Sequence, residues 1–98
     1  MQFDGFDWDD GNWPKCAKHG ISREDIESLL SSGADILPDR SVSTRETRFN
    51  AVGMGAEERY VFVVFTLRQQ NDETLVRPIS ARFMHQKEIN RYERTKTS

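Results

Sequence analysis

The sequence predicts a single α+β domain, an antiparallel sheet of four to five strands with two N-terminal helices and one C-terminal helix. Three features predict it: a capped amphipathic helix pattern early in the chain, a β-branched and aromatic run at 60–67, and an extended pattern that turns helical near residue 85. A chain of 98 residues is long enough to bury one core. We therefore expect one domain over 1–98, with a frayed end at 95–98.

The first elements are short. Residues 1–10 alternate aromatic and acidic side chains, which is typical of a charged edge strand. Asn12 is placed as an N-cap and Pro14 falls in the first turn, where its missing N–H costs little. This pattern predicts a short helix that ends at Gly20.

The second helix has the clearest signals in the chain. Ser22 and Asp25 stand three apart like a capping box, and apolar residues flank that cap as a hydrophobic staple. Gly33 stands where a left-handed C-terminal residue belongs. We expect a helix at about 23–31.

Strand patterns fill the rest of the chain. A short apolar run at 34–37 and a strand at 47–52 precede 60–67, which should be a central strand buried on both faces or nearly so. Short connections favour pairing of neighbouring strands as a meander. A last strand runs from 75 to 83, and Pro78 within it belongs at an edge or a bulge because proline cannot donate to a ladder.

Basic residues gather in the last strand and helix. Arg77 and Arg82 point to opposite faces of an ideal strand, so they meet one phosphate only if Pro78 introduces a bulge or Arg82 lies beyond the strand end. On the helix that follows, basic residues recur at spacings of four and three along one stripe. One helical face can therefore pack on the sheet while another meets an anion.

The charge distribution is uneven, although the net charge is only −2. Residues 1–44 carry four Lys/Arg and nine Asp/Glu, giving −5, whereas residues 45–98 carry ten and seven, giving +3. A bound nucleic acid must therefore meet the second half of the chain. No apolar run approaches the ~18 residues of a membrane span, and the acidic N-terminus is unlike a signal peptide, so we expect a cytoplasmic protein without membrane contact. The single cysteine, Cys16, excludes an intrachain disulfide.

Several segments, taken in order, resemble the BrnT family of bacterial toxins. They are FDWDDGNWPKCAKHGIS at 6–22, the Glu-x-Arg-Phe strand at 46–49, and RPISAR at 77–82 leading into a basic helix with RYE at 91–93. The resemblance implies a RelE-like fold and a ribonuclease that stops translation. It also implies a ribbon-helix-helix antitoxin of the BrnA type, in a hetero-oligomer of two toxins and two antitoxins that binds DNA through the antitoxin. The sequence departs from the family's common pattern at Pro14 and Pro78.

RNA cleavage without a metal needs a base for the 2′-OH, an acid for the leaving 5′-oxygen, and stabilisation of the extra charge at phosphorus. Arginine suits the last role because its planar fork holds two phosphate oxygens. Each candidate also has a structural alternative: His19 as a helix cap, His85 as an N-cap, and Glu46 with Arg48 as a salt bridge. The predicted catalytic residues are His19, Glu46, Arg48, Arg77, Arg82 and His85.

The remaining basic residues are candidates for sequence-independent contacts with the RNA backbone. The predicted RNA-binding residues are Lys18, Arg68, Lys87, Arg91 and Arg94. A charge run on a surface helix is otherwise only a solvated face. We expect no metal and no cofactor, because no histidine pair or carboxylate cluster has ligand spacing. The alternative function is a non-catalytic module that binds the antitoxin.

Overall fold

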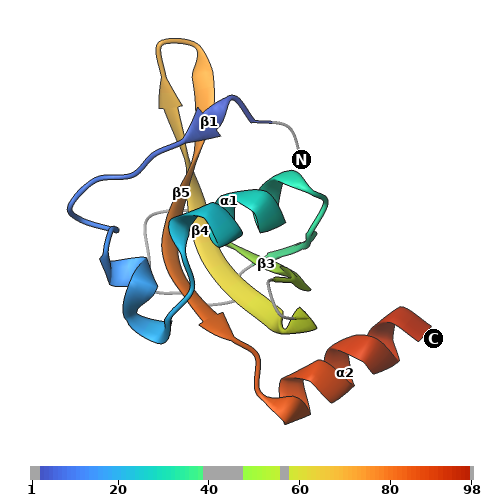
Figure 1. Ribbon diagram of the computed structural model, residues 1–98. Coiled ribbons are helices and arrows are strands. Elements are labelled where there is room, and N and C mark those ends of the chain that lie inside the picture. Colours follow the sequence, from blue (N-terminus) through green and yellow to red (C-terminus); the bar gives the residue numbers. More distant parts are fainter. Residues whose placement is uncertain (1–2, 39–47, 56–57, 98) are drawn as a thin grey trace.

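The computed structural model describes residues 3–38, 48–55 and 58–97. In chain order its elements are β1 (Gly5–Phe6), the 3₁₀ helix η1 (Lys15–His19), α1 (Arg23–Ser31), β2 (Asp35–Pro38), β3 (Arg48–Met54), β4 (Tyr60–Gln70), β5 (Glu73–Phe83) and α2 (Gln86–Thr97). Figure 1 shows α1 lying across one face of the sheet, while α2 follows the end of β5.

All five strands form one sheet in the order β1-β5-β4-β3-β2. The strands from β2 to β5 pair antiparallel with their chain neighbours, which confirms the predicted meander. β1 instead pairs parallel with β5, with Gly5 opposite Leu75. β1 therefore lies beside the long β4–β5 hairpin, near its turn (Figure 1). The sheet is mixed rather than wholly antiparallel.

The predicted arrangement of helices is wrong. The segment between Pro14 and Gly20 forms the 3₁₀ helix η1 and no α-helix, since so few residues cannot offset the cost of α-helix nucleation. Asn12 does not cap it. The described chain has two α-helices, α1 in its first third and α2 after the sheet, so the domain is α+β without two N-terminal helices.

Helix α1 forms where its caps predict it. The Ser22 hydroxyl accepts a hydrogen bond from the Asp25 backbone N–H at 3.1 Å, and Gly33 has a φ of 97° just past the helix end. The apolar stripe of the helix, which includes Ile26 and Leu29, is buried against the sheet. A Cβ at Gly53 of β3 would lie 3.1 Å from Leu29 Cγ, so glycine allows helix and sheet to approach closely there.

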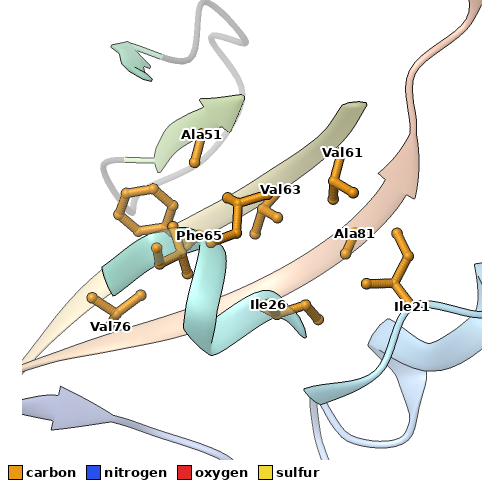
Figure 2. Packing of buried hydrophobic residues seen from close by; sticks show 10 residues of the cluster. Ile21, Ile26, Ala51, Val61, Val63, Phe65, Val76 and Ala81 are labelled. Atoms are coloured by element: carbon orange, nitrogen blue, oxygen red, sulfur yellow. The ribbon is translucent and has the colours of Figure 1, made fainter. Parts of the chain in front are cut away.

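The core lies between α1 and one face of the sheet. Figure 2 shows Val61, Val63 and Phe65 of β4 gathered with Ile26 of α1. These residues are at most 2% exposed, whereas Phe62, which alternates to the other face, is only half-buried. The central strand is therefore fully buried on one face only. Its second face is available to carry a site.

Candidate nucleic-acid interface

A bulge in β5 decides which side chains share the second face of the sheet. Val64 pairs with Ser80 and Phe65 pairs with Pro78, so Ile79 is an extra residue with no partner in the register. One extra residue reverses the alternation along a strand. Beyond Ile79, each β5 side chain therefore points to the face opposite to the one that unbroken alternation from Arg77 would give.

The bulge brings Arg77 and Arg82 to the same face. Arg77 lies opposite Thr66 and Arg82 lies opposite Phe62, and these two β4 residues are an even number of positions apart. Four residues of strand separate the two arginines by roughly 13 Å. They share a face but are too far apart to hold one phosphate group together.

Cross-strand pairing adds residues from β3 to this face. Arg48 lies opposite Thr66, and Asn50 lies opposite Val64, so Arg48 is two strands from Arg77, a distance of roughly 10 Å. We call this surface, which faces away from α1, the arginine face. Its polar members include Arg48, Asn50, Thr66, Arg68, Arg77, Ser80 and Arg82.

Arg82 is held at one end of the arginine face by a carboxylate from α2. Its Nη1 and Nη2 donate to Glu88 Oε1 and Oε2 at 2.7 and 2.8 Å, and its guanidinium lies 4.7 Å from the centre of the Phe62 ring. Glu88 also accepts the backbone N–H of His85 at 2.9 Å, as the third residue of a helix does in a capping box. Glu88 thereby holds the backbone N–H of His85 close to the Arg82 guanidinium.

The pKa of Glu88 is lowered from 4.5 to about 2, first by the hydrogen bonds from Arg82 and then by the His85 backbone N–H. Because the folded pKa is the lower one, the ion pair stabilises the fold above about pH 4.5, and this contribution is lost as the pH falls towards 2. Both side chains are 34% exposed, so screening limits the effect to about 1 kcal/mol or less. The Arg82–Glu88 pair is therefore an acid-sensitive contact.

We expect Glu88→Gln to be less stable than wild type at pH 6, with a difference that shrinks steadily as the pH is lowered towards 2. Glutamine keeps an oxygen for the His85 N–H but removes the charge. Urea denaturation at a series of pH values measures both free energies of unfolding. A difference that stays constant over this range would contradict the pH-dependent ion pair.

Arg77 is engaged by the N-terminal acidic segment. Its Nη1 and Nη2 donate to the two carboxylate oxygens of Asp9 at 3.0 and 2.9 Å, and Nη1 also donates to Asp7 at 3.3 Å. The pKa of Asp9 is lowered, first by Arg77 and then by the Gly11 backbone N–H. A Cβ at Gly11 would lie 3.0 Å from Arg77 Nη2, so the turn closes tightly over the pair. Arg68, 46% exposed, lies 3.9 Å from Asp7.

Arg48 and Asn50 carry unsatisfied polar atoms. Within the described part of the chain, Arg48 Nε and Asn50 Oδ1 are buried without a hydrogen-bond partner. A buried donor or acceptor left unpaired costs about 1–3 kcal/mol, so such groups are rare in folded proteins. Here an unpaired donor and an unpaired acceptor lie two residues apart in the sequence, on the arginine face.

The other predicted site residues are dispersed. Lys18 and His19 are exposed on η1, which packs on β5, and neither makes a hydrogen bond or ion pair with the residues that the structure describes. Three exposed residues continue the basic stripe along α2 beyond Arg82, and these are Lys87, Arg91 and Arg94. Glu46 lies outside the described residues.

No three His, Cys, Asp or Glu residues within 3–38, 48–55 and 58–97 are grouped closely enough to hold a metal ion. In the same ranges, no helix is long and apolar enough to cross a membrane.

The family model of BrnT, described as the ribonuclease toxin of type II toxin-antitoxin systems, matches residues 8–88. The chain belongs to the BrnT family. This confirms the resemblance seen in the sequence, and the match spans the strands of the arginine face and the start of α2. A BrnT protein is a ribonuclease toxin with an antitoxin partner. No curated protein sequence matches the chain.

The residues of this BrnT surface that were not predicted from the sequence include Glu88, Asp9 and Asn50. Glu88 stands three positions after His85, the spacing of a capping box, so a signal for it was present. No signal in the sequence marked Asp9, because its partner Arg77 lies 68 residues away. Asn50 is distinguished only by the burial of its Oδ1 atom, which the sequence does not show.

Proposed function

We propose that the chain is a metal-independent endoribonuclease that binds single-stranded RNA, and mRNA in particular, along the arginine face. The observation that carries this proposal is the bulge at Ile79, which turns Arg77 and Arg82 to the face that also holds Arg48. Membership of a ribonuclease family supports it. The spacing of the arginines suits an extended backbone better than a single phosphate group.

We propose that Arg82 binds the scissile phosphate. Two of its N–H groups donate to Glu88 and a third reaches the Phe83 carbonyl at 3.4 Å, so two of its five donors are free of contacts with described residues. These two donors, on Nε and Nη2, can bind phosphate while Glu88 holds the opposite end of the guanidinium. Arg82 would then stabilise the charge that develops at phosphorus.

For proton transfer we favour His85, because its backbone N–H is bonded to Glu88, the partner of Arg82, and its side chain is exposed. His19 and Glu46 remain the alternative acid and base. In this assignment Arg48 contacts flanking phosphates, and Arg77, already paired with Asp9, holds the N-terminal segment in place as a positioning residue. We assign the contacts with the RNA backbone on either side of the scissile phosphate to Arg68 on the sheet, Lys18 on η1, and Lys87, Arg91 and Arg94 on α2.

The test of metal independence is incubation of the refolded, antitoxin-free chain with bulk RNA in excess EDTA. We expect cleavage at the same rate with and without EDTA, since guanidinium groups supply the charge stabilisation that a metal would otherwise provide. His85→Ala should slow cleavage by about 10²-fold or more, and His19→Ala should slow it less.

Activity that disappears in EDTA and returns with Mg²⁺ would contradict metal independence. RNA left intact at any excess of a folded, antitoxin-binding chain would instead support the second candidate, a module that only binds the antitoxin.

We further propose that the antitoxin is a ribbon-helix-helix protein of the BrnA type, in a complex of two toxins and two antitoxins that binds DNA through the antitoxin. Family membership supports a partner of this kind. To silence cleavage it should cover the arginine face. An NMR footprint of the antitoxin confined to the α1 side of the sheet would contradict this, and co-purified complexes of known mass would test the stoichiometry.

A further inference from the structure

A groove of about 520 Å³ lies between α2 and the sheet, next to the Arg82–Glu88 pair. Most of its lining is apolar and comes from Ile36, Leu37, Val52, Phe62 and Met84. This volume falls within the range of roughly 300–1,000 Å³ that is typical of sites enclosing small ligands. The groove, which we call the α2 groove, can therefore take a few side chains but no whole helix.

The two exposed large hydrophobic residues of the described chain lie on the same face of the sheet as this groove. They are Leu37 at 46% and Met54 at 51%. Leu37 lines the groove, and Met54 lies opposite Tyr60, whose ring packs edge-on against Tyr92 of the lining at 5.5 Å. Exposed apolar residues gathered beside a concave site mark a protein-binding surface.

Helix α2 forms one wall of the groove without filling it. Polar and edge contacts attach the helix: Glu88 to Arg82, the Tyr92 hydroxyl to the Asp35 carboxylate, and the Tyr92 ring to Tyr60. Tyr92 and Ile89, the apolar residues of this helix, are themselves only half-buried. An apolar side chain entering from a partner would therefore gain contacts with both the helix and the sheet.

The charged residues of the lining indicate the chemistry of the occupant. Asp35 is bonded to Tyr92 and Glu88 is bonded to Arg82. Arg91 is exposed, and its side chain makes no hydrogen bond or ion pair with any described residue. A partner that complements this groove brings apolar side chains together with a carboxylate for Arg91.

We propose that the α2 groove receives a short segment of the antitoxin, with apolar side chains seated over Leu37 and Phe62 and an acidic residue paired with Arg91. This deepens the proposed function, because it rests on a proteinaceous antitoxin that silences the same face. Glu88 belongs both to the groove lining and to the Arg82 pair. A segment bound in the groove therefore lies next to the Arg82–Glu88 pair, at the α2 end of the arginine face.

The test compares the affinity of purified antitoxin for wild type, Leu37→Asp and Arg91→Glu, measured by calorimetry or surface binding. Each substitution should weaken binding by roughly 10-fold or more, since one buries a charge in the apolar contact and the other repels the acidic residue. Lys15→Glu on η1 is the matched charge-reversal control and should bind like wild type. Leu37 and Arg91 are exposed, and circular dichroism verifies that both variants fold.

Cleavage of bulk RNA by antitoxin-free wild type and Leu37→Asp separates this proposal from the ribonuclease proposal. Weakened antitoxin binding with cleavage retained in Leu37→Asp supports the groove, and weakened binding to a chain that cuts no RNA supports the groove while the ribonuclease proposal fails. Unchanged antitoxin affinity in both variants overturns the groove whatever the cleavage result. Lower cleavage with unchanged antitoxin affinity also overturns it and assigns the groove to RNA.

Discussion

Replacing Arg82 with alanine is expected to slow RNA cleavage by roughly 10²–10³-fold, the usual effect of removing one group that stabilises transition-state charge. The side chain is 34% exposed and packs on Phe62, so its loss should change the free energy of unfolding only slightly. Single-turnover cleavage of a defined RNA, together with urea denaturation of the same preparations, measures both effects. Comparable cleavage by wild type and Arg82→Ala would remove Arg82 from the site.

Glu88→Gln is the control that separates a role in binding RNA from a role in holding α2. If Arg82 acts on phosphate, releasing it from Glu88 should leave most of the cleavage, because the guanidinium is still present. Arg82→Lys keeps the charge but loses the planar fork, so it should recover only part of the rate. Equal losses in Arg82→Ala and Glu88→Gln would show that only the ion pair matters.

Asn12→Ala is expected to lower the free energy of unfolding by roughly 2–4 kcal/mol, because three backbone groups lose their partner. Asn12 is only 3% exposed. Its Oδ1 accepts the Asp9 N–H at 2.8 Å, and its Nδ2 donates to the carbonyls of Asp7 and Pro78 at 2.9 and 2.8 Å. This one side chain therefore joins the N-terminal acidic segment to the bulged part of β5.

Urea denaturation of Asn12→Ala beside Asn90→Ala measures this effect. Asn90 is exposed on α2 and bonds only Gln86 among the described side chains, so its loss should cost less than about 0.5 kcal/mol. An Asn12→Ala protein as stable as wild type would show that water replaces all three hydrogen bonds.

Elements specified by neighbouring residues were predictable from the sequence. The cap at Ser22 and the left-handed Gly33 bracket α1 as expected, and the β-branched run that begins at Tyr60 forms the central strand. The α2 helix also begins where the pattern changes, next to His85. In each case the signal lies within a few residues of the structure that it specifies.

Features that depend on distant partners were not predictable. The parallel pairing of β1 joins Gly5 to Leu75, and the Arg77–Asp9 pair joins residues 68 apart, so no local pattern reports either. The proline at position 78 indicated that the last strand could contain a bulge, but not that Ile79 would be the extra residue. The periodicity of the last strand therefore gave the arginines as candidates, and only the register showed which of them share a face.

The parallel pairing of β1 with β5 has a consequence for how the chain folds. The pairing brings together segments that are far apart in the chain, such as Gly5 and Leu75, so the entropy of closing that loop must be overcome before any contact is gained. During synthesis, β1 leaves the ribosome long before β5 exists and has to wait for it. The N-terminal acidic segment is therefore already made when Arg77 emerges, so its two carboxylates stay unpaired during most of synthesis and can neutralise Arg77 as soon as β5 forms.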